Sequence, residues 1–397
     1  MKPTNQIYTG LPTTIFETMS RLAAQHGAIN LGQGFPDLDG PLEIRLKAAD
    51  ELLNGYNQYP PMLGLPALRK AVAEANRRFY GLEIDPDKGV LVTSGATEAL
   101  SDCINALIEP GDEIILIEPL YDCYLPLAER AGASVKSVRI TPPDWRLDLD
   151  ALRRAFSDRT KAILLNNPQN PAGKVFDRQE LQAIADLLIE FDAYAICDEV
   201  YEHIIFDGRS HIPLMSLEGM KERCLRIGSA GKTFSLTGWK VGYISGPEGL
   251  LDPVAKAHQY TTFTTPPNLQ AAVAEGLGKE DAYYQVLSGD LAAKRDRLGQ
   301  GLAKLGFDVI PCAGTYFLTV DISTIADRMH VEPDDVAFCQ KMTEEAKVTA
   351  VPVSAFYRQG KTGAAEDIPR QFVRFCFSKK DSVLDAAIDR LASWLDH

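Results

Sequence analysis

The chain has 397 residues, of which 45% are hydrophobic and 24% are charged, the ordinary composition of a globular protein. At a typical ~150 residues per domain, this length predicts two to three domains. The 41 basic and 54 acidic residues give a formal net charge of −13. This charge excludes the broad basic surface that nucleic-acid binding needs, and it leaves room only for a local basic pocket.

The sequence also argues against a membrane protein or a secreted one. No window approaches the roughly 18 apolar residues of a membrane span, and the segment MKPTNQIYTGLPTT lacks the apolar core of a secretory signal. Seven cysteines, odd in number and without a CxxC pair, indicate neither a disulfide framework nor a zinc site and favour a reducing cytoplasm. The six histidines form no HExxH motif, so no metal is expected.

In chain order, the first predicted element is a helix over Ile15–His26. From about residue 65 to 250, short apolar runs alternate with helical patterns such as Thr97–Ile108 and Arg178–Phe191. This alternation predicts an α/β fold of three layers, in which helices cover both faces of a mostly parallel, seven-stranded sheet. The predicted strands are Val90–Thr93, Glu113–Ile117, Ser134–Val138, Ala162–Leu165, Tyr194–Cys197, Leu225–Gly228 and Val241–Ser245.

The last hundred residues have a different pattern, which predicts an α+β unit. Short strands are expected near Val309 and over Tyr316–Val320, Val348–Ala350 and Phe372–Phe377, between helices over Ala282–Leu305, Pro333–Ala346 and Asp381–Trp394. The first forty residues are too few to fold alone and are expected to join this unit. We therefore predict a large α/β domain over residues 46–285 and a small α+β domain built from residues 1–45 and 286–397.

Small residues follow the strand Val90–Thr93, in the segment Ser94–Thr97 that opens a helix. Such residues let backbone N–H groups approach an anion, and a helix N-terminus adds partial positive charge. The segment fits a phosphate site, although it is neither a P-loop nor a GxGxxG motif. A tight structural turn explains it equally well.

An Asn-Pro segment, Asn166–Gly173, follows the strand Ala162–Leu165. Its two prolines cannot continue a strand ladder, so the chain must leave the sheet in a fixed loop. The segment then presents amide side chains where open α/β sheets bind ligands. A plain turn is the alternative, because Asn and Pro dominate turns.

The apolar strand Tyr194–Cys197 ends in an acidic pair, Asp198 and Glu199, with Tyr201 shortly after. One interpretation is a carboxylate aimed at a buried cation, with a phenol nearby. The other is a solvated loop or a helix cap, which is the usual role of such a pair.

Two lysines follow the strand Leu225–Gly228. Lys232 sits among small residues in Gly228–Phe234, which leaves its ammonium room to meet a carbonyl group, and Lys240 lies eight residues further on. A desolvated lysine can act as a Schiff-base nucleophile, and a second lysine can neutralise a phosphate. Taken singly, each is also compatible with an exposed solubility residue.

Together, these segments resemble the fold-type I, class I pyridoxal-phosphate-dependent aminotransferases, most closely the branch with the kynurenine/glutamine and methionine aminotransferases. The resemblance runs from Asn30–Asp37 to Val373–Ser378, and the Asn-Pro loop, the Asp-Glu-Val-Tyr sequence and the Ser-x-x-Lys sequence carry it. It implies the fold of the PLP-dependent transferases, with pyridoxal 5′-phosphate as the cofactor.

The resemblance implies the catalytic roles. Lys232 would form the internal aldimine with the cofactor and move a proton between the substrate Cα and the cofactor. Asp198 would face the pyridine nitrogen and keep it protonated. Tyr201 and Asn170 would hydrogen-bond the ring 3-oxygen, and Tyr121 would stack on the ring.

The resemblance also implies how the phosphate is held. Ala96, Thr97, Ser229 and Lys240 would bind it, and Tyr59 would reach the phosphate of a neighbouring subunit, in a homodimer with shared active sites. Many class I relatives carry arginine at the position of Lys240. Lysine supplies the charge without the bidentate fork, so a single contact is expected there.

For the substrate, the resemblance implies that Arg374 clamps the α-carboxylate, assisted by Asn170 and the Gly34 backbone. An arginine within the apolar run Phe372–Phe377 is otherwise explained by an edge strand that faces solvent. Three aromatic residues are candidate walls of a side-chain pocket: Phe16, Tyr59 and Phe263. Core packing explains Phe16 and Phe263 equally well.

The predicted reaction moves the amino group of an α-amino acid, of apolar, aromatic, methionine or glutamine type, to a 2-oxo acid. The same cofactor chemistry also supports β-elimination from cysteine conjugates, and no feature of the sequence excludes this alternative. A third alternative is a non-catalytic binding protein on the same scaffold. The joint presence of five implied site residues argues against it: Lys232, Asp198, Tyr201, Asn170 and Arg374.

Overall fold

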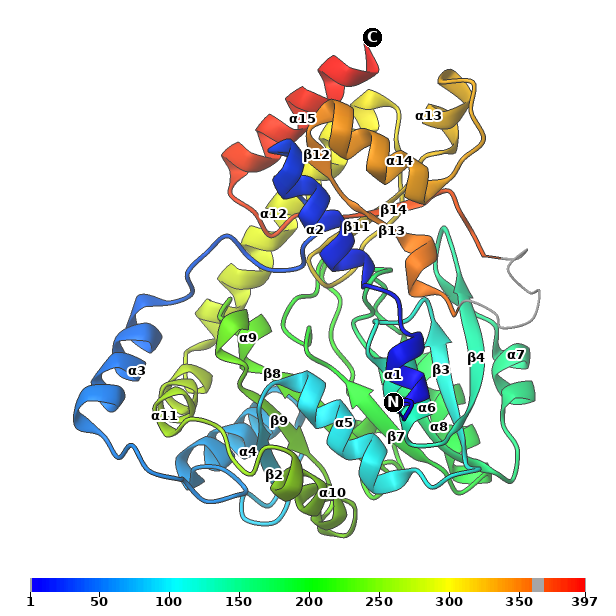
Figure 1. Cartoon of the computed structure of the whole chain (residues 1–397). Coiled ribbons are helices and arrows are strands. Elements are labelled where there is room, and N and C mark those ends of the chain that lie inside the picture. The colour runs from blue at the N-terminus through cyan, green and yellow to red at the C-terminus, as the bar shows by residue number, and fades with distance from the viewer. Residues whose placement is uncertain (1, 359–367, 397) are drawn as a thin grey trace.

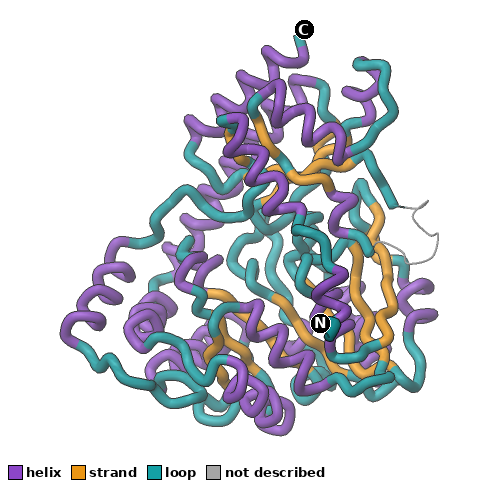
Figure 2. Tube along the Cα trace, viewed as in Figure 1, coloured by secondary structure: helices purple, strands orange, loops and turns teal. Residues whose placement is uncertain are grey.

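A computed structural model describes residues 2–358 and 368–396, with a large sheet at its centre (Figures 1 and 2). Its strands are β2 (Val90–Thr93), β3 (Glu113–Glu118), β4 (Ser134–Thr141), β5 (Arg146–Leu147), β6 (Thr160–Asn166), β7 (Tyr194–Asp198), β8 (Cys224–Ser229) and β9 (Gly242–Ser245). They lie in the order β2-β9-β8-β7-β6-β3-β4-β5. Neighbours from β8 to β4 are parallel, whereas β9 is antiparallel to both β2 and β8. The predicted mostly parallel sheet is confirmed.

All seven predicted strands are present, and β5 is an additional strand at the edge. The strand β4 continues to Thr141, three residues beyond its predicted end, and pairs there with β5 in an antiparallel ladder, Ile140 with Leu147 and Thr141 with Arg146. A strand of two residues is too short to show an alternating pattern. The sequence therefore does not predict it.

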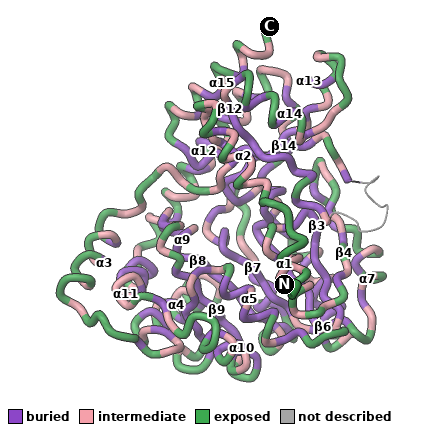
Figure 3. The backbone as a smooth tube through the Cα atoms, viewed as in Figure 1, coloured by how far each residue is buried: buried purple, intermediate pink, exposed green. Residues whose placement is uncertain are grey.

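Helices cover both faces of this sheet, because successive side chains of each strand point to opposite faces. Ile114 and Leu116 pack in a core with side chains of α5 (Ala96–Leu107), α6 (Tyr124–Arg130) and α10 (Glu248–Thr261). Ile115 and Ile117 pack on the other face with α7 (Leu149–Ala155) and α8 (Arg178–Glu190). Near β2, that second face is covered by α3 (Leu42–Asn54), α4 (Pro66–Tyr80) and α11 (Pro267–Leu277). Figure 3 shows the buried strands between these layers.

A smaller, antiparallel sheet lies beside the large one. Its strands follow the order β10 (Asp308–Val309), β11 (Phe317–Asp321), β14 (Phe372–Cys376), β13 (Val351–Pro352). The helices around it are α12 (Asp281–Leu305), α13 (Ser323–Arg328), α14 (Asp335–Lys341), which continues into a π-helical turn over Met342–Ala346, and α15 (Asp381–Leu395).

The N-terminal residues reach this smaller sheet and its helices. The short strand β1 (Ile29–Asn30) pairs in parallel with β12 (Val348–Thr349), and α2 (Ile15–His26) contacts β12 and β13. The predicted bounds of α2 are confirmed, since Thr14 caps its start and Gly27, with a φ of 59°, ends it. The first helix, α1 (Gln6–Gly10), instead contacts α6.

The predicted domain boundaries, at residues 45/46 and 285/286, fall inside the continuous helices α3 and α12. The division into two domains stays a prediction. Among the described residues, no helix is long and apolar enough to cross a membrane. The seven cysteines are free thiols, and six of them are buried.

Candidate active site

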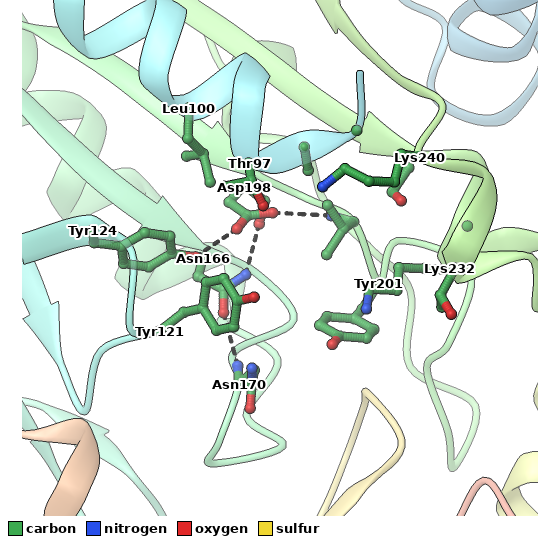
Figure 4. A pocket seen from close by; sticks show the side chains of 16 residues that line it. Thr97, Leu100, Tyr121, Tyr124, Asn166, Asn170, Asp198, Tyr201, Lys232 and Lys240 are labelled. Atoms are coloured by element: carbon green, nitrogen blue, oxygen red, sulfur yellow. Dashed lines mark hydrogen bonds between the residues drawn. The ribbon is translucent and has the colours of Figure 1, made fainter. Parts of the chain in front are cut away.

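A cavity of about 210 Å³ lies where β2, β6, β7 and β8 end (Figure 4). These four strands run in the same direction, so the loops that follow them meet at one edge of the sheet. Sixteen residues line the cavity: Gly95, Ala96, Thr97, Leu100, Tyr121, Tyr124, Asn166, Asn170, Asp198, Val200, Tyr201, Ser229, Gly231, Lys232, Thr237 and Lys240.

The cavity contains nine of the ten residues that the sequence suggests for a cofactor: Ala96, Thr97, Tyr121, Asn170, Asp198, Tyr201, Ser229, Lys232 and Lys240. The tenth, Tyr59, does not line it. Tyr59 is 81% exposed, and its ring packs edge to face on Phe263 at 5.6 Å between centroids. Phe263 is therefore no wall of this cavity within one chain.

At one end of the cavity, a carboxylate is buried at the end of β7. Asp198 is 4% exposed and accepts a hydrogen bond of 2.5 Å from the Tyr124 hydroxyl and one of 3.4 Å from the Val200 N–H. Burial raises the pKa of Asp198, while the Tyr124 bond and the charge of Lys232 oppose this rise. A buried carboxylate of this kind calls for a cationic partner. The sequence does not single out Tyr124, whose only signal is its position three residues after Tyr121.

The opposite end of the cavity is suited to an anion. The N-terminal turn of α5 is formed there by Ala96 and Thr97, after Gly95 with a φ of 81°, and Lys240 stands beside it. The start of β9 packs tightly against this turn, because a Cβ on Gly242 would lie 2.6 Å from the carbonyl carbon of Gly95. Backbone N–H groups and a cation thus face one small volume.

The same cavity contains Lys232, on the short helix α9 (Ala230–Thr233) directly after β8. Its Nζ donates to the Tyr316 hydroxyl at 3.0 Å, and that hydroxyl donates to the Gly34 carbonyl at 2.8 Å. The Nζ also lies 5.6 Å from the ring centroid of Tyr201. Lys232 is therefore held inside the cavity rather than in solvent. Tyr316 was not a sequence candidate, and its place at the start of a predicted strand gives no hint of this contact.

Arg374 lies beside the cavity, and no carboxylate of the described residues accepts a hydrogen bond from its guanidinium. It is 1% exposed on β14, and it donates 2.8 Å hydrogen bonds to two neutral oxygens, Asn170 Oδ1 and the Gly32 carbonyl. Its Nε is buried without a partner. Burial lowers the pKa of Arg374 to about 10, so the guanidinium stays charged at neutral pH. The strand β14 lies between β11 and β13, so Arg374 is not on an edge strand that faces solvent.

Three aromatic rings surround this guanidinium. Its central carbon lies 5.2 Å from the ring centroid of Phe16, 3.8 Å from that of Phe317 and 5.0 Å from that of Phe356. The loop residue Gly34 packs on the same group, because a Cβ there would lie 2.6 Å from the Phe317 ring. Phe16 and Gly34 were sequence candidates, while Phe317 and Phe356 were not.

Comparison with known proteins decides the family. The model of the family described as aminotransferase class I and II matches residues 26–391. The chain belongs to this family. The sequence resemblance and the predicted fold are therefore confirmed.

Individual aminotransferases are similar over nearly the whole chain. The solved structure of N-succinyldiaminopimelate aminotransferase from Mycobacterium tuberculosis is 43% identical, with a TM-score of 0.94 over 99% of this chain and 100% of that one. The methionine aminotransferase of Escherichia coli is 41% identical over 96% of each chain. Human kynurenine–oxoglutarate transaminase 3 is 40% identical over 97% of this chain and 89% of its own. All three are named for amino-group transfer, and none for the β-lyase alternative.

This aminotransferase depends on pyridoxal phosphate, and the cavity fits that cofactor. The buried Asp198 carboxylate suits a protonated pyridine nitrogen at one end, and the α5 turn with Lys240 suits a phosphate at the other. The amine of Lys232 lies in the same cavity, where it could bond to an aldehyde carbon.

Replacing Tyr124 of the aminotransferase with phenylalanine should move the acid limb of its activity profile to higher pH. Burial already raises the pKa of Asp198, and the hydroxyl bond that opposes it would be lost. The carboxylate would then take up a proton at a higher pH than in the wild type. The measurement is kcat/KM between pH 5 and 9. Tyr284→Phe, which removes a hydroxyl bond to the Leu277 carbonyl, should leave the limb in place.

Proposed function

We propose that this aminotransferase moves the amino group of an α-amino acid with an apolar, aromatic, methionine or glutamine side chain to a 2-oxo acid. The observation that carries the proposal is the position of Arg374. A buried guanidinium with an unpaired Nε shares Asn170 with the cofactor cavity and is ringed by aromatic side chains. It offers a place for a carboxylate with apolar surroundings beside it.

Bound pyridoxal phosphate supplies the electron-accepting ring that makes the bond between the substrate Cα and its hydrogen labile. The Lys232 amine would take that proton from the substrate Cα and deliver it to C4′ of the cofactor, since one flexible side chain can reach both positions. Asp198 would face the pyridine nitrogen as a carboxylate and keep the proton on it. Tyr201 and Asn170 would donate to the ring 3-oxygen, and Tyr121 would lie against the ring face.

The phosphate would be held by the N–H groups of Ala96 and Thr97, the Ser229 hydroxyl and the Lys240 ammonium. The α5 turn supplies partial positive charge there, and Lys240 adds a full one. The substrate α-carboxylate meets Arg374, with Asn170 beside it. The Gly34 backbone would lie along the substrate, because its carbonyl is tied to Tyr316 next to Lys232.

The preferred amino donor should have an apolar or aromatic side chain. Phe16, Phe317 and Phe356 surround the carboxylate position, and Arg374 is the one cation of the described residues that lies against these rings. An anionic side chain beside them would therefore be desolvated without a cation of its own. We expect methionine, phenylalanine, kynurenine or glutamine to convert the bound cofactor faster than aspartate, by about tenfold or more. Absorbance spectra recorded with single donors measure this. If aspartate or N-succinyldiaminopimelate proves the fastest donor, the proposed preference is wrong.

We also propose a homodimer in which Tyr59 serves the partner's active site. Large apolar and aromatic side chains are exposed on α3 and in the segments after it and at the end of α10. We call them the α3 patch: Leu42, Leu46, Leu52, Leu53, Tyr56, Tyr59 and Tyr260. Each is more than half exposed, and a concentration of exposed apolar side chains is typical of an interface. Tyr59 lies within it, so a second copy seated there would cover this ring.

The double substitution Leu46→Lys and Leu53→Lys should dissociate the dimer. Two charges placed in the α3 patch would have to be desolvated on association, which costs several kcal/mol. Light scattering coupled to gel filtration should give a mass near twice 43.6 kDa for the wild type and near 43.6 kDa for the variant. Val331→Lys, at an exposed residue far along the chain, is the control and should stay dimeric. A wild-type mass near 43.6 kDa would contradict the proposal.

The division into a large domain over residues 46–285 and a small one from residues 1–45 and 286–397 is also part of this proposal. It is supported by the cavity, whose lining residues all lie between 95 and 240, whereas Arg374 comes from the smaller sheet. The substrate would then bind between the two. A cytoplasmic location, suggested by the free cysteines, completes the proposal.

A further inference from the structure

A group of buried ionisable side chains lies behind the anion end of the cavity. Glu98 and Asp102 are one turn apart on α5, and His258 reaches them from α10. The His258 Nδ1 lies 2.9 Å from Glu98 Oε1 and 3.7 Å from Asp102 Oδ2, and its Nε2 lies 3.2 Å from the Met62 carbonyl oxygen. All three ionisable side chains are buried. The proposed mechanism uses none of them.

The contacts of His258 require both of its ring nitrogens to carry a proton. A carbonyl oxygen can only accept, so the Nε2 that faces Met62 is a donor. The Nδ1 faces the carboxylates of Glu98 and Asp102, so it is a donor as well. An imidazole with two N–H groups is the cation.

The surroundings of His258 favour the same state. The helix α10 packs on α5 and β2, and neither β2 (Val90–Thr93) nor the segment Met62–Leu65 contains an ionisable side chain. On α10 itself, Lys256 is exposed and pairs with Asp252. Burial lowers the pKa of His258, but the nearby carboxylates of Asp102 and Glu98 outweigh it and raise the pKa to about 9.

Glu98 connects this cation to the residues that precede α5, at the end of the cavity that is suited to an anion. Its second oxygen, Oε2, accepts the backbone N–H of Ser94, directly before the glycine and the two residues whose N–H groups line the cavity. Without a cation, the carboxylates of Glu98 and Asp102 would repel each other in a buried place. The Glu98 side chain would then turn away, and Ser94 would lose its partner.

We propose that His258 is a positioning residue for the cofactor phosphate. Its imidazolium holds Glu98 against Ser94 and so keeps the N–H groups of Ala96 and Thr97 aimed at the phosphate. This inference rests on the phosphate site proposed above. His258 should therefore affect the affinity for a cofactor only if that cofactor carries the phosphate group.

The variant His258→Asn tests this role. The asparagine amide can donate to Glu98 from the place of Nδ1, but it carries no charge and does not reach Met62. Holoenzyme is dialysed against a series of pyridoxal phosphate concentrations, and in parallel against pyridoxal, which lacks the phosphate. We expect the dissociation constant for pyridoxal phosphate to rise about tenfold and that for pyridoxal to stay unchanged.

The difference between wild type and variant should also depend on pH. The pKa of His258 is raised, so its cation is present at neutral pH and is lost as the pH rises through about 9. The ratio of the two dissociation constants should therefore fall toward one above that pH. Other groups that titrate in the site act on both proteins and cancel in the ratio.

Two further variants guard against a merely structural effect. Glu98→Gln has a single acceptor oxygen for two donors, so it should reproduce the phosphate-selective loss even if His258→Asn fails to fold. His203→Asn removes a largely buried imidazole whose pKa burial lowers to about 4, which makes it neutral. It should lower the melting temperature without changing the affinity for pyridoxal phosphate.

The outcomes separate this role from the phosphate site itself. Equal weakening of pyridoxal and pyridoxal phosphate, or a ratio independent of pH, would overturn the role of His258. So would one divalent metal ion per chain that is lost in His258→Asn, because the metal would then take the place of the Nδ1 proton. If Lys240→Ala also leaves the affinity for pyridoxal phosphate unchanged relative to pyridoxal, the proposed phosphate site fails. If Lys240→Ala weakens it and His258→Asn does not, only the role of His258 fails.

Discussion

Replacing Lys232 with alanine should reduce turnover by at least about 10⁴-fold. The variant loses both the amine that bonds the cofactor and the base that moves the substrate proton. Its neighbours Tyr316 and Tyr201 cannot take over, since burial raises the pKa of both hydroxyls well away from neutrality. Steady-state rates with a good donor, and the visible absorbance of the bound cofactor, measure the two losses separately.

Two controls keep this result specific. Lys256→Ala, on the exposed side of α10, should behave as the wild type. Methylamine added to Lys232→Ala should restore part of the activity, because it supplies the missing amine to a cavity that is otherwise intact. Normal transamination by Lys232→Ala would show that another residue carries the chemistry and would remove the central assignment.

Replacing Arg374 with alanine should raise the KM for every amino donor by about 100-fold, which corresponds to one bidentate, charge-assisted contact of about 3 kcal/mol. The α-carboxylate is common to all donors, so the loss should not depend on the side chain. Steady-state kinetics with methionine, phenylalanine and glutamine measure it.

The matched variant Arg374→Lys keeps the charge but not the fork, and it should recover only part of the loss. Arg374 also orders Asn170, so a small fall in kcat should accompany the rise in KM. A loss confined to one class of side chain would contradict a carboxylate clamp and would move Arg374 to the side-chain pocket.

The sequence predicts the fold and the position of most of the cavity because their signals are local. Each strand that delivers a lining residue is an apolar run, and it is followed by small residues, by prolines or by an acidic pair. Asp198 and Lys232 lie immediately beyond such runs. Parallel strands then bring these ends together whatever the details of packing.

The contacts that tune the cavity are not predictable in the same way. Tyr124 meets Asp198 across 74 residues, and Lys232 meets Tyr316 across 84. In sequence, each of these tyrosines resembles any other aromatic residue of a core. The role of Phe356 is still harder to predict, because this residue reaches Arg374 from a single turn of 3₁₀-helix rather than from a strand or a long helix. Such residues acquire their roles only from the tertiary structure.

The burial of Arg374 has a consequence for molecules that the enzyme should refuse. A primary amine formed by decarboxylation carries the same reactive nitrogen as an amino acid, but it has no anion to offer the unpaired Nε. That N–H group is already buried without a partner in the free enzyme. An amino acid would satisfy it and the amine would not, a difference of about 1–3 kcal/mol. The guanidinium would thus favour amino acids over amines, although no group repels the amine. The cause is the one N–H group that is buried without a partner in the free enzyme.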